Sequence, residues 1–159
     1  MSVNISNTTP AAPAGNQLAT FQTDGSGNMS AYVPASSTLV TASSVNLTGQ
    51  GANISATNLV ASPSTGMYKI SAYIIVTTVD GVSSTLPSVV ITWTDPDNST
   101  SQSLTLTATS TGNSLTTYKS ATVPINVFSG AAIQYSTTGY ASNTASQMKY
   151  ALHIRVEAV

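Results

Sequence analysis

Apolar and polar residues alternate with a period of two through most of this 159-residue sequence, most clearly near the C-terminus. Two interleaved sets occupy the segment 147–159. The apolar set is Met148, Tyr150, Leu152, Ile154 and Val156, and the other set is Lys149, Ala151, His153, Arg155 and Glu157. Because successive side chains of a β-strand point to opposite faces, this pattern predicts an antiparallel strand with its apolar face inward.

Similar segments recur along the chain, and none has a convincing helical period. The predicted strands cover 38–48, 52–60, 67–78, 85–94, 103–109, 118–127, 132–138 and 147–159. Turn signals separate them at Gly49-Gln50-Gly51, Asp80-Gly81, Asp95-Pro96-Asp97-Asn98 and Gly112-Asn113. About eight short strands with frequent turns, and no fixed internal repeat, predict an all-β antiparallel jelly-roll β-sandwich over residues 37–159.

Residues 1–36 form a different region, with little periodic hydrophobicity and several Pro and Gly residues. This composition predicts an extended N-terminal attachment arm. Its spaced apolar residues are candidate anchors on another surface: Leu18, Phe21, Met29, Tyr32 and Val33. The alternative is that the arm wraps its own domain.

The charge content is unusually low and excludes several classes of partner. Only 6% of the residues are charged, and the formal net charge is −1. We therefore expect no nucleic-acid partner, since such proteins carry clustered basic residues. No apolar stretch approaches the ~18 residues of a membrane span, and the N-terminus lacks secretory signal features. We expect a protein made in the host cytoplasm, without membrane contact and without disulfides, because it has no cysteine.

The sequence offers little for catalysis, and we expect no enzyme, no cofactor and no metal. His153 is the single histidine, it lies on the polar face of the last predicted strand, and no G-x-S-x-G motif is present. Asp95 and Asp97 are the closest pair of carboxylates, but their setting favours turn capping. A calcium site formed by Asp95, Asp97 and Asn98 is the alternative, although the rest of an EF-hand pattern is missing.

Two stretches of the predicted sandwich resemble C1q/TNF-like jelly-roll domains, including those of phage structural proteins. They are Gly66-Met67-Tyr68-Lys69-Ile70-Ser71-Ala72-Tyr73 and Val127-Phe128-Ser129-Gly130-Ala131-Ala132-Ile133-Gln134-Tyr135-Ser136, followed by the last strand. The arm is similar to segments of phage virion proteins. The segments that carry this likeness are Thr9-Pro10-Ala11-Ala12-Pro13-Ala14-Gly15-Asn16, Phe21-Gln22-Thr23-Asp24-Gly25-Ser26-Gly27-Asn28 and Ser30-Ala31-Tyr32-Val33-Pro34.

The C1q/TNF-like resemblance implies a homotrimer packed through an apolar sheet face. The residues allow this independently, because tyrosine is favoured at interfaces. Candidates for the interface or the core are Tyr68, Tyr73, Tyr118, Tyr135, Tyr140 and Tyr150.

Together these features predict a non-enzymatic structural virion protein, a capsid decoration or head-fibre protein. It would trimerise and attach through its arm to the major capsid protein or another virion protein. The alternative is a tail-fibre or adhesin tip that binds host-surface glycans, and an extracellular fibre of non-viral origin is a third hypothesis. Trp93 shares a predicted face with Val89 and Ile91, so we expect it in the core and not as a sugar-binding platform.

Overall fold

A computed structural model describes residues 20–23, 29–32 and 40–159, and the side chains from residue 42 onward. The chain divides into two compact units, Met1–Thr38 and Leu39–Val159. Each unit is described by itself.

The N-terminal unit contains a small antiparallel hairpin. Its strands are β1 (Thr20–Thr23) and β2 (Met29–Tyr32), paired from Thr20 with Tyr32 to Thr23 with Met29. The sequence indicated an extended arm and did not predict this pairing. The five residues between the strands have a length and a Gly-rich composition suited to a hairpin loop.

Three predicted anchors, Phe21, Met29 and Tyr32, lie on the strands of this hairpin. Leu18 and Val33 lie outside the described residues. The role of the five anchors stays a prediction.

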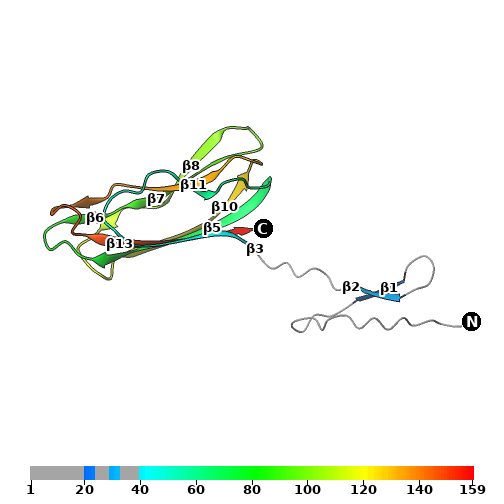
Figure 1. The fold of residues 1–159 in the computed structure, drawn as a ribbon, viewed down its shortest axis with the longest axis horizontal. Helices are drawn as coiled ribbons and strands as arrows, with labels where there is room; N and C mark the ends of the chain where they lie inside the picture. The colour runs from blue at the N-terminus through cyan, green and yellow to red at the C-terminus, as the bar shows by residue number, and fades with distance from the viewer. Residues whose placement is uncertain (1–19, 24–28, 33–39) are drawn as a thin grey trace, which may run out of the picture. The chain divides into compact units, whose positions relative to one another are not determined.

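The C-terminal unit contains two four-stranded antiparallel sheets, which form two layers in Figure 1. One sheet has the order β10-β5-β13-β3, and its strands are Tyr118–Val127, Gly66–Thr78, Lys149–Ala158 and Val40–Gln50. The other has the order β4-β11-β7-β8, with strands Thr57–Val60, Ile133–Thr138, Ser88–Thr94 and Ser101–Thr107. A smaller sheet, β12-β6-β9, pairs Ala141–Ser142, Ser84–Leu86 and Ser110–Thr111.

The path of the chain between the two large sheets is that of a jelly roll. The chain passes from β3 to β4 and back to β5, then makes the hairpin β7–β8 in the opposite sheet. It returns to β10, crosses to β11 and ends on β13, between β3 and β5. The predicted fold class is therefore confirmed. Among the described residues, no helix is long and apolar enough to cross a membrane.

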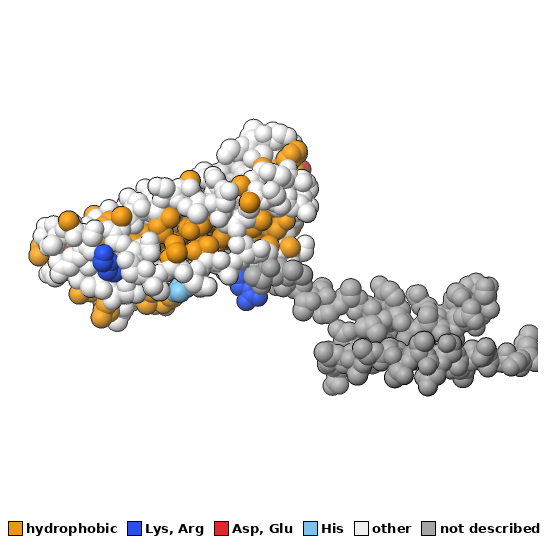
Figure 2. All heavy atoms as spheres, in the orientation of Figure 1, with side chains coloured by type: hydrophobic (Ala, Val, Ile, Leu, Met, Phe, Trp, Pro, Cys, Tyr) orange, Lys and Arg blue, Asp and Glu red, His pale blue; other side chains and the backbone are white. Residues whose placement is uncertain are grey.

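The core lies between the two sheets and is made by the inward-facing alternate residues of their strands. The last strand behaves as predicted, since Met148, Tyr150, Leu152, Ile154 and Val156 are all buried. Hydrophobic side chains gather between the layers in Figure 2, whereas the surface facing the viewer is otherwise largely uncharged and polar. Burial of this apolar area is the main force that holds the sandwich together.

Two predicted strands differ most from the structure, for identifiable reasons. Residues 85–94 form two strands, β6 and β7, because Pro87 between them has no N–H to donate. Residues 52–60 form a strand only from Thr57. The preceding segment bonds through Ile54 instead, whose N–H donates to Thr137 Oγ1 over 2.7 Å and whose carbonyl accepts from Thr137 N over 2.9 Å.

Candidate functional site

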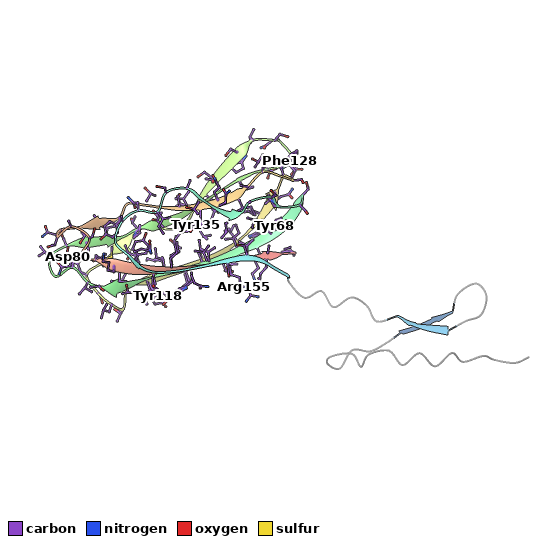
Figure 3. All side chains as sticks on the ribbon, in the orientation of Figure 1. Tyr68, Asp80, Tyr118, Phe128, Tyr135 and Arg155 are labelled. Atoms are coloured by element: carbon purple, nitrogen blue, oxygen red, sulfur yellow. The ribbon has the colours of Figure 1, made fainter. Side chains whose placement is uncertain are left out.

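The outer face of the β10-β5-β13-β3 sheet combines exposed aromatic rings with uncharged polar side chains. Figure 3 shows Tyr118 and Arg155 on the outside of this layer, whereas Tyr68 and Tyr135 lie between the layers. Strand pairing arranges the outward residues in rows that cross all four strands. One row contains Ser120, Tyr73, His153 and Asn46, and the next contains Thr122, Ser71, Arg155 and Ser44.

A shallow groove of about 760 Å³ lies over these two rows. Their eight side chains line it together with Ala72, Ala121 and Ile154. Because neighbouring strands are about 4.8 Å apart, a row that crosses four strands extends about 14 Å. We call this surface the Tyr73 groove.

Three rings form an aromatic strip at the edge of the Tyr73 groove. The centroids of Tyr73 and His153 are 6.2 Å apart with planes 27° from parallel, and those of Tyr73 and Tyr118 are 5.7 Å apart at 33°. Tyr73 is 36% exposed and Tyr118 57% exposed. The rings therefore pack on one another and still contact solvent.

Hydrogen bonds fix the polar side chains of the Tyr73 groove. Nδ1 of His153 lies 2.9 Å from Oδ1 of Asn46. Since an amide oxygen only accepts, Nδ1 of His153 is the donor in this contact. The hydroxyl of Thr122 donates to Ser71 Oγ over 3.0 Å, so the Ser71 hydroxyl keeps its own proton for a further bond.

One ion-pair network borders the Tyr73 groove. Nε of Arg155 lies 3.1 Å from Oε1 of Glu157, and Nζ of Lys69 lies 3.4 Å from Oε2 of the same carboxylate. Arg155 is the one charged residue among those that line the groove. Pairing with Glu157 reduces its local field, so the groove does not present the concentrated charge that a polyanion requires.

The tyrosines listed as candidates for the interface or the core divide between these environments. Tyr68, Tyr135 and Tyr150 are buried, and Tyr140 packs against the core from a partly buried position. Only Tyr73 and Tyr118 among these six are exposed. Among these six, their rings are the most accessible to a partner.

The other residues considered for chemistry have structural surroundings. Oδ1 of Asp95 accepts a hydrogen bond from Asp97 N over 2.9 Å, and Oδ1 of Asn98 accepts one from Thr100 N over 3.0 Å. These bonds are the turn capping that the sequence predicted. In the described part of the chain, no three His, Cys, Asp or Glu side chains gather as a metal site.

Trp93 packs against the core from a partly buried position, as predicted. Its Nε1 is buried and has no hydrogen-bond partner among the described residues. It does not line the Tyr73 groove. The aromatic groups of that groove are Tyr73 and His153 instead.

Asp80 is the buried carboxylate of this unit, and it lies at an end of the sandwich in Figure 3. Its oxygens accept from Ser142 Oγ over 2.7 Å, from Thr144 N over 2.9 Å and from Val82 N over 3.0 Å. These bonds, that from Ser142 first, hold the pKa of Asp80 below its ordinary value. The carboxylate joins the segment after β5 to β12 and to the loop that follows β12, and it does not line the Tyr73 groove.

Comparison with known proteins gives no family. No protein-family model matches the chain, and no curated protein matches it. One similar solved structure is the CBM22-1–GH10 portion of Clostridium thermocellum xylanase 10B complexed with xylohexaose. Its TM-score is 0.36 at 11% identity, and the match covers 60% of this chain and 17% of that one.

Another is a carbohydrate-binding module of Cellvibrio mixtus lichenase 5A in complex with cellotriose. Its TM-score is 0.31 at 14% identity, and the match covers 90% of this chain and 87% of that one. Our assignment of the fold depends on the strand order and not on these two similarities.

The sequence analysis missed the Tyr73 groove as a site, although part of the signal was available. Alternation placed His153 and Arg155 on the outward face of the last strand, and the same rule applied to the strand 67–78 places Tyr73 outward. What was missing is the pairing of distant strands. Asn46 lies opposite His153, and Ser71 opposite Arg155, only because β13 sits between β3 and β5.

Proposed function

We propose that this chain is a non-enzymatic structural protein of a phage particle, an accessory capsid protein of the decoration or head-fibre type. It forms a homotrimer through one end of the outer face of the β10-β5-β13-β3 sheet and attaches to a capsid or other virion protein through residues 1–36. The observation that carries the proposal is the apolar end of this sheet face, next to the Tyr73 groove.

The apolar end consists of Tyr118, Ile75 and Ala151, which occupy one row across three strands. Tyr118 is the most exposed aromatic residue with a described side chain. Ala151 is buried, although it alternates with the inward residues of β13 and is not part of the core cluster. Apolar groups and tyrosine at the centre of a patch with few charges are typical of the core of a protein interface.

The low charge and the arm support the same function. Contacts between uncharged groups are little screened by salt, which suits a particle exposed to changing ionic strength. Three weakly binding arms on one trimer act at a high effective concentration and raise the overall affinity by about 10²–10⁴-fold. Arms of other proteins bind by adding a strand to an exposed sheet edge or by burying spaced apolar side chains.

The first test is the mass of the full-length protein in solution, measured by light scattering. We expect three chains of 16.2 kDa each. Tyr118→Asp should convert the trimer into monomers, because an unpaired carboxylate in a desolvated interface is strongly unfavourable. The matched control is Phe128→Asp, which changes another exposed aromatic residue, far from Tyr118 in Figure 3.

A wild-type monomer would contradict the proposal. A trimer that survives Tyr118→Asp would place the interface on a different surface. Loss of the trimer in both variants would show a general effect of charge and no specific role for the apolar end.

A further inference from the structure

The Tyr73 groove has features that trimer formation through the apolar end does not use. Tyr118, Ile75 and Ala151 are not among the residues that line it. Its own lining contains hydroxyl groups from three strands, one amide, one imidazole and one phenol ring. We propose that the Tyr73 groove is a binding site for a neutral oligosaccharide.

The first argument is the match between the polar groups and sugar hydroxyls. A sugar hydroxyl both donates and accepts, so a site that recognises several of them needs donors and acceptors side by side. The Asn46 amide supplies N–H donors, and Nε2 of His153 supplies a second polar nitrogen in the next position of the same row. Ser71 supplies a hydroxyl proton that its contact with Thr122 does not use.

The second argument is the aromatic strip. A pyranose ring presents C–H groups on its faces, and an aromatic ring offers an apolar surface with a negative face to contact them. Tyr73 lies between Tyr118 and His153, and its ring is held by contacts with both. A ring that is already fixed loses little conformational entropy when a ligand stacks on it.

The third argument is charge, which selects a neutral ligand. The guanidinium of Arg155 is paired with Glu157, and the groove lining contains no other Lys, Arg, Asp or Glu. An anionic polymer would need several basic groups to replace its counterions. The groove is also open and about 14 Å across four strands, so an extended chain of sugar units fits better than a small enclosed ligand.

The experiment uses the full-length protein on a printed array of neutral and acidic oligosaccharides. The strongest neutral oligosaccharide is then titrated by calorimetry. We expect Tyr73→Ala and Asn46→Ala each to weaken binding by about tenfold or more, as the loss of a central contact does. Thr105→Ala removes an exposed hydroxyl from the opposite sheet and should leave the affinity unchanged.

Three outcomes would overturn this inference: no binding of neutral oligosaccharides at millimolar concentration, binding of acidic oligosaccharides alone, or binding that the double variant of Tyr73 and Asn46 retains. The mass of every variant is measured by light scattering in parallel. A monomer that still binds sugar refutes the proposed trimer and leaves the sugar site intact. A trimer that binds no sugar refutes the sugar site and leaves the proposed trimer intact.

Discussion

Asp80 shows how a chain with few charges uses one carboxylate to hold its loops. It is 1% exposed, and it accepts hydrogen bonds from Val82 in its own segment, from Ser142 on β12 and from Thr144 in the loop between β12 and β13. All three partners are donors, so the charged form is the one that fits the site. The side chain therefore stabilises the fold in its ionised state.

We predict that Asp80→Asn lowers the melting temperature at pH 7. An amide has only one acceptor atom, so its NH₂ group would face a donor of Val82, Ser142 or Thr144. Because the pKa of Asp80 is lowered on folding, its contribution is complete above the ordinary pKa of 3.8 and is lost as the pH falls below it. The difference between wild type and variant should therefore shrink in acid.

The measurement is thermal unfolding by circular dichroism from pH 7 to pH 2. Asp97→Asn is the control, because Asp97 is exposed on a turn and should change little at any pH. A difference between wild type and Asp80→Asn that stays constant across this range would argue against the linked protonation.

At the scale of the elements, the sequence predicted most strands and the fold class but not the connections between them. Strand 118–127 has the predicted bounds, since Tyr118 begins it after a turn and Phe128 follows it at the next. The strands β9 and β12 were missed because two residues are too few to show an alternation. The Tyr73 groove depends on the order of four strands in one sheet, and a local pattern contains no information on that order.

A buried hydrogen-bond network joins β11, β13 and the segment between β3 and β4. The hydroxyl of Tyr150 on β13 donates to the carbonyl of Ala52 over 2.8 Å and lies 3.0 Å from Thr137 Oγ1 on β11. The same Thr137 oxygen accepts from Ile54 N. The network therefore fastens the segment between β3 and β4 to both sheets, and each hydroxyl in it has a partner.

We predict that Tyr150→Phe lowers the free energy of unfolding by about 1–3 kcal/mol, because it leaves the Ala52 carbonyl and the Thr137 hydroxyl without this partner. The measurement is unfolding in urea. Thr105→Val is the control, since it removes an exposed hydroxyl from β8 in the other sheet. Equal stability of Tyr150→Phe and wild type would mean that water or another group replaces the lost hydroxyl.

At the scale of the whole molecule, the proposal separates assembly from attachment. Every residue of the hydrophobic core that the structure describes belongs to the unit Leu39–Val159. The apolar end and the Tyr73 groove also lie in that unit. The unit should thus fold, trimerise and bind sugar by itself, and residues 1–36 should matter for attachment alone.

We therefore predict that a chain of residues 37–159 has the mass of a trimer and a melting temperature close to that of the full-length protein. Light scattering and circular dichroism measure the two quantities. If the truncated chain is monomeric, the arm belongs to the trimer interface. This result would fit an arm that wraps the domains. A truncated trimer with a much lower melting temperature would mean that the arm stabilises the sandwich, and its contacts would then be unavailable for a virion partner. Only a stable trimer without the arm leaves residues 1–36 with attachment as their function, because nothing in the folding of the sandwich would then require them.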